Sequence, residues 1–350
     1  MSLYSHDVVH KDMERMLSDE SVPFDKLKGK TILITGATGM LAYYMTCACM
    51  HLNLTRAYGI HVIALVRNEQ KARVRFEEFL TDEHFELCVQ DVCEPIKLTC
   101  HIDYIVHAAG AASPWFIKHD PVGIVRANTI GTMNVMECAK NTGAANVLFL
   151  STREIYGEVK GVSMIKETDM GIIDPKEPRS CYPESKRMSE QILQSYYSQY
   201  GVPYTIARIA HSYGPGMIIE NDGRVMSDFI CDTVHRRNIV LKSEGLAERA
   251  FCYITDAVTA LFIILLKGQI SEAYNVANET EPTPIKDVAQ KLVELFPDEG
   301  RQVIFEIAGD TSGYCAYKRV GLDTSKLEAL NWKVKVSLEE GMKNTVLSFE

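Results

Sequence analysis

The chain alternates between short apolar runs and longer segments with helical periodicity. Six apolar runs begin at Thr31, His61, Phe85, Tyr104, Asn146 and Tyr204, and they read TILIT, HVIALV, FELCV, YIVHAA, NVLFLS and YTIARI. Helical patterns lie between them, most clearly in Asp120–Asn141 and Tyr182–Tyr200. Short apolar strands that alternate with helices are typical of βαβ units around a parallel sheet with both faces covered. The pattern predicts an α/β fold with a doubly wound parallel sheet.

The same pattern divides the chain into three parts. Residues 1–28 are polar with scattered apolar positions, which predicts a helix and a linker. The regular alternation occupies residues 29–211 and predicts the main domain. From 212 to 350 the order loosens into loops, short helices and isolated strands, which predicts a smaller C-terminal α/β domain. We expect some later segments, such as 250–276, to return to the main domain. A chain of 350 residues is long enough for two domains.

Composition narrows the class of protein. Hydrophobic residues make up 46% and charged residues 24%, as in an ordinary globular protein. The net charge of -9 argues against nucleic acid as a partner, because non-specific binding to nucleic acid needs a basic face. An anionic ligand would instead be held by a few local arginines.

The cysteines and the apolar stretches bear on location. Ten cysteines are scattered without a Cys-x-x-Cys pair, and the N-terminus lacks the tripartite pattern of a signal peptide. The longest apolar stretch, Ala260–Leu266, is too short to span a bilayer. We therefore expect a cytoplasmic protein with reduced thiols and no membrane partner. No cluster of His, Cys and carboxylates has metal-ligand spacing, so we expect no metal.

A glycine pattern follows the first apolar run. The segment TILITGATGMLA places Gly36, Gly39 and Ala42 where a strand passes directly into a helix. Gly36 would allow a tight turn, Gly39 a close approach of the backbone to a pyrophosphate, and Ala42 close packing of the helix on the sheet. An ordinary strand–turn–helix could share this pattern, but its place at the first strand favours a dinucleotide site in a Rossmann-type sheet.

The end of the second run bears on which dinucleotide binds. An acid there would hydrogen-bond the adenosine ribose, whereas an arginine accommodates a 2′-phosphate. Val66 stands where the acid would be, and Arg67 and Lys71 follow. The pattern favours NADP, although Arg67 could equally be a solvated surface charge. Asp91, after the third run, could accept a hydrogen bond from the adenine amino group or could be a turn residue.

Three polar residues form a candidate catalytic set. Tyr182 and Lys186 are four residues apart in a helical pattern, so they share one face. A nearby ammonium would favour the phenolate and lower the pKa of the tyrosine. Thr152 directly follows the fifth run, at the sheet edge where open α/β folds bind ligands. A Tyr-x-x-x-Lys pair alone is common, but with the glycine turn and the strand-end threonine it indicates oxidoreduction of a substrate hydroxyl.

These features resemble the extended short-chain dehydrogenase/reductase family, which includes nucleotide-sugar epimerases, dehydratases and decarboxylases. The resemblance runs over nearly the whole chain from Lys30. It is carried by TGATG, HAAGAASP, NTIGTMNVMECAKNTGA, STREIYGE, PRSCYPESKRMSE, ARIAHSYGPGM, DGRVMSDF and ERAFCYITD. Around Ser113, Arg179 and Arg224 it is most similar to the UDP-glucuronate decarboxylases.

The resemblance implies roles for particular residues. Thr152, Tyr182 and Lys186 would be the catalytic triad, Asn128 would help position the lysine, and Arg249 would bind the substrate diphosphate. The implied cofactor contacts are Gly36, Thr38, Gly39, Met40, Leu41, Arg67, Asp91, Val92, Ala108, Ala109, Gly110, Asn128, Tyr182 and Lys186. The implied substrate contacts are Ser113, His211, Arg224, Arg249 and Arg319. We expect a homodimer with tightly bound NAD(P) and a nucleotide-diphosphate sugar as substrate.

The residues after Thr152 bear on the reaction. Relatives first oxidise the sugar at C4, and in 4,6-dehydratases an Asp-Glu pair then removes water. Here the pair is Arg153 and Glu154, and an arginine cannot donate a proton at neutral pH. Decarboxylases keep the glutamate and add a C-terminal arginine, for which Arg319 is the candidate. We therefore expect a UDP-glucuronate decarboxylase-like reaction, with Glu154 as a fourth catalytic residue.

Other reactions remain open at this point. A 4,6-dehydratase is the second choice and a nucleotide-sugar 4-epimerase, which would need neither Glu154 nor Arg319, the third. A non-catalytic dinucleotide sensor is disfavoured because it would not need the complete triad. Two departures affect the substrate and cofactor: His211 stands where relatives have an asparagine, and Arg67 where the decarboxylases have an NAD-type acid. His211 could also be a structural loop histidine.

Overall fold

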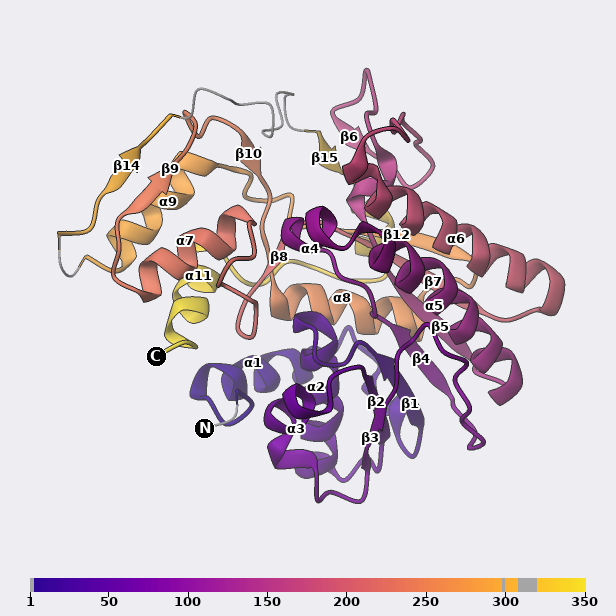
Figure 1. Cartoon of the computed structure of the whole chain (residues 1–350). Helices are drawn as coiled ribbons and strands as arrows, with labels where there is room; N and C mark the ends of the chain where they lie inside the picture. Colours follow the sequence, from indigo (N-terminus) through magenta and orange to yellow (C-terminus); the bar gives the residue numbers. More distant parts are fainter. Residues whose placement is uncertain (1–2, 298–299, 308–319) are drawn as a thin grey trace.

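A seven-stranded parallel sheet forms the centre of the computed structural model, which describes residues 3–297, 300–307 and 320–350 (Figure 1). The strand order is β12-β7-β5-β4-β1-β2-β3, and every neighbouring pair is parallel. The strands are β1 (Thr31–Thr35), β2 (His61–Val66), β3 (Phe85–Val89), β4 (Tyr104–His107), β5 (Asn146–Thr152), β7 (Tyr204–Ile209) and β12 (Glu272–Val276). The predicted doubly wound Rossmann-type sheet is confirmed, and all six apolar runs form its strands.

Helices cover both faces of this sheet (Figure 1). One face carries α4 (Pro114–His119), α5 (Pro121–Thr142) and α6 (Cys181–Tyr200), and the other α2 (Met40–Arg56), α3 (Glu69–Arg75) and α8 (Ile254–Lys267). Successive side chains of a strand point to opposite faces. In β1, Ile32 and Ile34 accordingly join the core on the α2 side, and Leu33 joins the core beneath α5 and α6.

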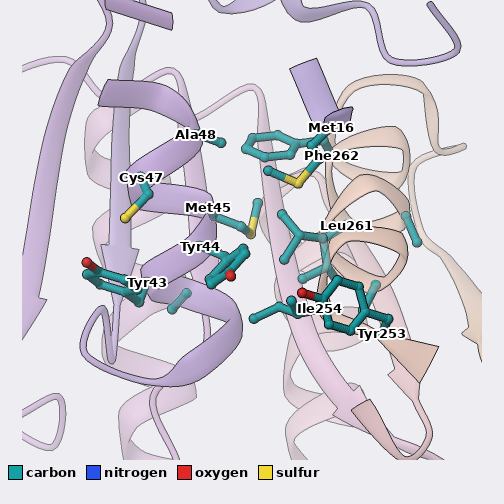
Figure 2. Packing of buried hydrophobic residues seen from close by; sticks show 14 of the residues in the cluster. Met16, Tyr43, Tyr44, Met45, Cys47, Ala48, Tyr253, Ile254, Leu261 and Phe262 are labelled. Carbon is teal, nitrogen blue, oxygen red and sulfur yellow. The ribbon is translucent and has the colours of Figure 1, made fainter. Parts of the chain in front are cut away.

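The N-terminal segment packs onto the sheet's helical layer. Helix α1 (Asp7–Leu17) contacts α2 and α8, and a short 3-10 turn (Phe24–Leu27) follows. Figure 2 shows Met16 of α1 beside α2 and α8. Asp12 of α1 is buried and accepts hydrogen bonds from the hydroxyls of Tyr44, at 2.9 Å, and Tyr253, at 2.8 Å. Residues 7–17 therefore connect the first helix of the sheet to a strand of the C-terminal part.

The C-terminal part is a smaller α/β unit beside the carboxyl ends of the strands (Figure 1). Its helices are α7 (Val225–Val234), α9 (Ile285–Leu295), α10 (Ser325–Glu328) and α11 (Leu338–Leu347). Its short strands are β8 (Ser212–Tyr213), β9 (Ile239–Leu241), β10 (Glu248–Arg249), β11 (Cys252–Tyr253), β13 (Thr283–Pro284), β14 (Val303–Phe305) and β15 (Gly321–Leu322), the last paired with β6 (Met164–Ile165). Between β11 and β13 the chain returns to the main sheet, where α8 covers it and β12 extends it beside β7.

Helix α8 is the most apolar helix described. Every residue from Ile254 to Leu266 is buried, most of them against α1, α2 and the sheet. Across the described residues, no helix combines the length and the apolar character needed to cross a membrane.

Candidate active site

The turn from β1 into α2 forms the first wall of the site. Gly36 has φ of +64°, and its N–H donates to the carbonyl of Leu65 at 2.9 Å. A Cβ at Gly36 would lie 2.7 Å from the Cα of Ala109. Only glycine fits this left-handed conformation and this close approach between two strand ends. The predicted role of Gly36 as the tight-turn residue agrees with this geometry.

Helix α2 presents its N-terminus at the same edge. Gly39 is its cap residue, and no side chain hydrogen-bonds to the first turn. Gly39 is exposed, and Thr38, Met40 and Leu41 are partly exposed. Ala42 is buried, as close packing on the sheet requires. A helix N-terminus with uncapped N–H groups favours an anion such as a pyrophosphate.

The loop after β4 brings the opposite wall close. Gly110 has φ of +148°, and a Cβ there would lie 2.6 Å from Asn128 Oδ1 and 3.8 Å from Lys186 Nζ. The Asn128 amide donates to the Ser185 hydroxyl at 2.9 Å, while its buried Oδ1 has no partner. Asn128 thus holds the residue next to Lys186. The narrow passage at Gly110 and the unpartnered acceptor fit a bound dinucleotide.

The end of β2 leaves the choice of dinucleotide undecided. Val66 is buried, whereas Arg67 is exposed and has no hydrogen bond or ion pair with the described residues. Asp91 accepts from the N–H of Cys93 at 2.8 Å, as a turn residue does. Val92 is buried and packs against Gly131 of α5. The Arg67 side chain is accessible to a 2′-phosphate, but its exposure alone does not distinguish NADP from NAD.

The structure brings the three predicted catalytic residues together. Thr152 is the last residue of β5, and Tyr182 and Lys186 lie one turn apart on α6; all three are buried. The Thr152 hydroxyl interacts with the Tyr182 phenol in the direction that lowers the Tyr182 pKa. Lys186 Nζ donates to the carbonyl of Leu150 at 2.7 Å and lies 4.4 Å from the ring centroid of Phe149.

One electrostatic expectation for this set is wrong. Burial raises the pKa of Tyr182, and the nearby carboxylate of Glu154 raises it further, which outweighs the hydrogen bond from Thr152. Burial also lowers the pKa of Lys186 to about 7, so the lysine is a weak source of positive charge. Removing both groups from water disfavours the phenolate and the ammonium alike. The spacing of Tyr182 and Lys186 along a helix predicts that the two side chains are close, but it does not show that both are removed from water.

Glu154 and Arg153 point to different partners. Glu154 receives two hydrogen bonds from Arg179, at 2.6 and 2.9 Å. Arg153 instead lies 3.4 Å from His211 Nε2 and donates to the carbonyl of Val320 at 3.2 Å. The cation that contacts Glu154 is therefore Arg179, which is distant in sequence, and not its neighbour Arg153. His211 has φ of +46° and is held in a network, as well as being a candidate substrate contact.

A pocket of about 710 Å³ adjoins the site. Its lining comprises Ser113, Pro114, Trp115, Phe116, Lys118, His119, Ile218, Glu220, Asn221, Asp222, Gly223 and Asp228. Ser113 is the cap residue of α4, and Arg224, just beyond the loop, forms a two-point ion pair with Asp222. Arg249 lies in β10, partly exposed, and donates to the carbonyl of Glu248. Arg319 lies outside the described residues.

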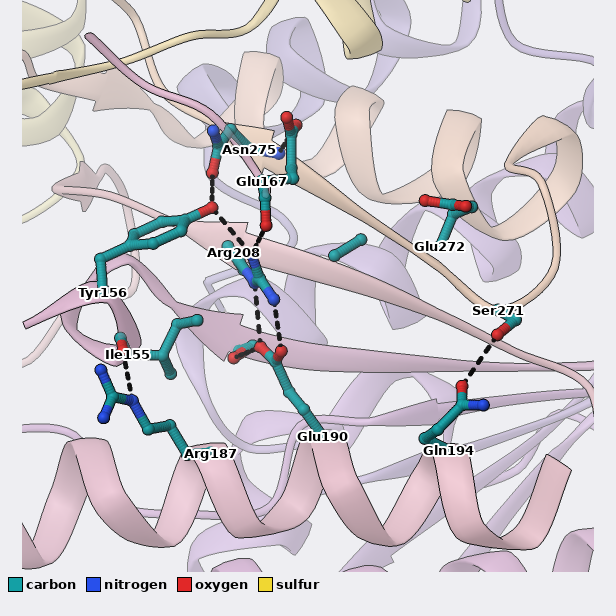
Figure 3. Close-up of polar contacts among 12 residues, drawn as sticks. Ile155, Tyr156, Glu167, Arg187, Glu190, Gln194, Arg208, Ser271, Glu272 and Asn275 are labelled. Atoms are coloured by element: carbon teal, nitrogen blue, oxygen red, sulfur yellow. Dashed lines mark hydrogen bonds and ion pairs between the residues drawn. The ribbon is translucent and has the colours of Figure 1, made fainter. Parts of the chain in front are cut away.

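A buried polar network supports the strand end beneath Thr152 (Figure 3). Glu190 accepts from the Ser151 hydroxyl at 2.6 Å and pairs with Arg208 at 2.7 Å. Arg208 also donates to the Tyr156 hydroxyl at 3.0 Å. The Glu190 carboxylate raises the pKa of Lys186, which lies one turn earlier on α6, and so partly offsets the effect of burial. Sequence reasoning missed Glu190, although its place four residues after Lys186 puts it on the same helix face.

The chain is similar in sequence to a known protein family and to named relatives. The sequence model of the NAD dependent epimerase/dehydratase family matches residues 32–277. UDP-glucuronic acid decarboxylase 6 of Arabidopsis thaliana is 33% identical over 322 residues, which cover 89% of this chain and 86% of the plant protein.

Two solved structures share the fold. The UDP-glucuronic acid 4-epimerase of Bacillus cereus, solved with UDP-glucuronic acid and NAD, has a TM-score of 0.73 and 20% identity, covering 91% of this chain and 98% of that one. DesIV of Streptomyces venezuelae, a dTDP-glucose 4,6-dehydratase solved with NAD, has a TM-score of 0.75 and 20% identity, covering 91% and 96%. At these identities the two structures establish the fold.

Proposed function

Because the chain belongs to the NAD dependent epimerase/dehydratase family, we propose that it oxidises a UDP-hexuronate at C4 and then removes its carboxylate. The family membership agrees with the resemblance seen in the motifs. The observation that carries the proposed reaction is the set of Thr152, Tyr182 and Lys186 at one strand end, followed by Glu154 with an arginine and not an acid at position 153. The similarity to a UDP-glucuronic acid decarboxylase supports the same choice.

Tyr182 and Thr152 would perform the first step. The Tyr182 oxygen takes the proton of the sugar 4-hydroxyl, and Thr152 holds the same oxygen through its hydroxyl. A dinucleotide held by this site would supply the acceptor for the hydrogen and electron pair that leave C4, together with the positive charge of its oxidised ring. That charge would favour the Tyr182 phenolate, which burial disfavours in the protein alone. Gly36, the α2 N-terminus and Gly110 would hold the dinucleotide.

Glu154 would act in the second step. A 4-keto uronate is a β-keto acid, so the C5–C6 bond breaks, carbon dioxide leaves and the electron pair forms an enolate. C5 must then receive a proton, and the return of the hydrogen and electron pair to C4, with a proton to its oxygen, would close the cycle. Arg179 forms a two-point pair with the Glu154 carboxylate and so orients it. Glu154 would orient a water molecule and pass a proton from it to C5.

Two other reactions of the family compete with this proposal. A 4,6-dehydratase needs an acid where Arg153 stands, and Arg153 is engaged by His211 and Val320. A 4-epimerase needs room for the keto sugar to turn over, which the adjoining pocket of about 710 Å³ could offer. A dinucleotide sensor without catalysis would leave the buried triad unused.

Product analysis distinguishes these reactions. The purified protein is incubated with UDP-glucuronate, UDP-glucose and dTDP-glucose, and the products are weighed by mass spectrometry. We expect loss of carbon dioxide from UDP-glucuronate alone. Loss of water would indicate the dehydratase, and an unchanged mass with altered sugar stereochemistry would indicate the epimerase.

We infer a preference for NADP within this NAD(P)-binding site. Arg67 is exposed and unpaired among the described residues, and the buried Val66 offers no carboxylate to a ribose. Fluorescence titration of the apoprotein with both dinucleotides tests this, with Arg67→Ala as the variant and Arg73→Ala, on helix α3 that follows Arg67, as the control. Tighter binding of NAD, or no effect of Arg67→Ala on NADP, would identify Arg67 as a surface charge.

We also infer a homodimer formed through α5 and α6. These helices pack side by side and expose Val122, Val125, Met133 and Met188, by 68, 38, 49 and 52% (Figure 1). Large apolar side chains grouped on one face favour association. Sedimentation of Met133→Glu should give monomers, whereas Val74→Glu, at an exposed site on α3, should leave the dimer intact. A wild-type monomer at micromolar concentration would overturn the inference.

We also infer a cytoplasmic location, from the state of the cysteines. The nine cysteines among the described residues are free thiols, and they are scattered over sheet, helices and loops. Such thiols persist in a reducing compartment. Fractionation of cells that express the full chain would test the location.

A further inference from the structure

We propose that Glu220, Cys231 and His235 form a binding site for a divalent cation of the zinc type, at the C-terminal end of α7. One ligand atom from each residue lies within 4.8 Å of the other two. A thiol, an imidazole and a carboxylate are the ligands that Zn²⁺ takes in proteins. The site lies outside the catalytic set. The sequence predicted no metal, because Glu220 stands eleven residues before Cys231 in no recognised metal-binding spacing.

The imidazole has the orientation that a metal ligand requires. Nδ1 of His235 lies 2.8 Å from the carbonyl oxygen of Cys231, so this nitrogen carries the proton and donates it. Metal-bound histidines are commonly held by such a hydrogen bond. Nε2 is left with its lone pair, 3.3 Å from Oε1 of Glu220. Two ligands at ~2.1 Å from a tetrahedral Zn²⁺ are about 3.4 Å apart. The spacing therefore suits one ion between them.

The surroundings already attract positive charge. The C-terminus of a helix carries a partial negative charge, and α7 ends at Val234. The guanidinium of Arg237 donates to Cys231 Sγ at 3.3 Å while its Nε pairs with Asp232 at 3.0 Å. A bound ion would take the sulfur, and Arg237 would keep Asp232. Arg237 is thus a competitor for the site, which gives the proposal a sharp test.

The exposure of two of the three ligands allows an ion to enter and leave the site, and the binding step balances in protons and electrons. Cys231 is buried, whereas the side chains of His235 and Glu220 are 45% and 59% exposed. A hydrated ion would enter from their side and keep water as a fourth ligand. On binding, the Cys231 thiol releases its proton to solvent as the sulfur–metal bond forms, and no electron is transferred.

The site would connect two parts of the pocket wall. Glu220 belongs to the loop that lines the pocket beside Ser113, and Asp228 of α7 lines it too. An ion that joins Glu220 to Cys231 and His235 would fix this loop against α7. The loop leads directly to Arg224, so the ion would also order a candidate substrate contact.

Zinc titration of the reduced, chelator-treated full chain tests the site. We expect one ion per chain by calorimetry, with binding weakened at least ~10-fold in Cys231→Ser and in His235→Ala. Cys100→Ser is the matched control, because Cys100 is an exposed thiol next to a histidine. Arg237→Ala should tighten binding by removing the competing cation. With Co²⁺, a thiolate-to-metal absorption band should appear in wild type and vanish in Cys231→Ser.

Two outcomes would overturn the proposal. One is the absence of stoichiometric binding in wild type and in Arg237→Ala. The other is binding that survives Cys231→Ser but is lost in Cys100→Ser. Folding of each variant is checked by thermal melting in the presence of chelator, so that a misfolded variant is not read as a loss of ligand.

Discussion

The guanidinium of Arg179 holds both carboxylate oxygens of Glu154, at 2.6 and 2.9 Å. The two residues are 25 positions apart, and the pair is only partly buried, with side-chain exposures of 58% for Arg179 and 32% for Glu154. The two-point contact fixes the orientation of Glu154 beside Thr152, whose hydroxyl accepts from the Glu154 N–H at 3.2 Å. The orientation of this carboxylate is therefore set by a residue outside the candidate set of Thr152, Tyr182 and Lys186.

Glu154→Gln should permit oxidation at C4 but stall at the keto stage. Glutamine is nearly isosteric and can still contact Arg179, but it cannot exchange a proton with C5. Reduced dinucleotide should then accumulate on the enzyme as a persistent near-ultraviolet absorbance band. Glu158→Gln, at an exposed site in the same segment, is the control and should cycle normally. Normal turnover by Glu154→Gln would leave the 4-epimerase as the reaction.

Tyr182→Phe should abolish dinucleotide reduction, by at least ~100-fold in rate, while leaving dinucleotide affinity nearly unchanged. In the proposed mechanism the hydroxyl would carry the proton, whereas the turn at Gly36 and the N-terminus of α2 would hold the pyrophosphate. Stopped-flow absorbance gives the rate, and fluorescence titration gives the affinity. Tyr156→Phe, which removes another buried hydroxyl, serves as the control for packing. Rapid reduction by Tyr182→Phe would remove Tyr182 from its assigned role.

Glu190→Gln should shift the pH profile of dinucleotide reduction towards lower pH. Glu190 is the group that supports the charge of Lys186, whose pKa burial has lowered to about 7. Without the carboxylate, the pKa of Lys186 should fall further. Ser151→Ala removes only the hydrogen bond to Glu190 and should leave the profile in place. If wild type, Glu190→Gln and Ser151→Ala share one pH profile, the Glu190–Arg208 pair is purely structural. Thermal melting of each variant shows whether the substitution has caused misfolding.

Asp12→Asn should remove part of the loss of stability that occurs as pH rises. Burial raises the pKa of Asp12 to about 6, above its unfolded value near 3.9. A carboxyl with a raised folded pKa stabilises the fold fully below about pH 4, and this contribution disappears as pH rises through about 6. The difference amounts to up to about 3 kcal/mol. Urea unfolding of wild type, Asp12→Asn and the exposed-site control Glu14→Gln between pH 4 and pH 7 measures it; parallel profiles for wild type and Asp12→Asn would contradict the prediction.

The strands of the sheet could be predicted from the sequence because most of them are encoded by a local apolar run. Each of the six apolar runs is continuous and bounded by turns, so the existence and parallel type of these strands follow from the pattern, whereas their order in the sheet comes from the structure. Strand β12 was anticipated only as a segment that returns, because EAYNV is short and half polar. Its place beside β7 depends on a pairing across some 60 residues.

The proximity of the candidate site residues could be predicted, but their electrostatics could not. Motif spacing predicts that Thr152, Tyr182 and Lys186 lie together at one strand end, and the structure places them there. The direction of the Tyr182 pKa was wrong, because it depends on desolvation by side chains from several elements. The contact of Glu154 with Arg179 could not be predicted either, since the two residues are 25 positions apart and meet only in the folded chain.

The late return of β12 constrains the order in which the chain can fold during synthesis. Until residue 276 has left the ribosome, β7 is an exposed edge strand and the apolar surface that α8 covers is open to water. A fragment that stops at residue 211 would carry both liabilities permanently. The nascent dinucleotide-binding half is therefore expected to depend on chaperones, or to remain only partly folded, until the substrate-side segment between β8 and β11 has been made.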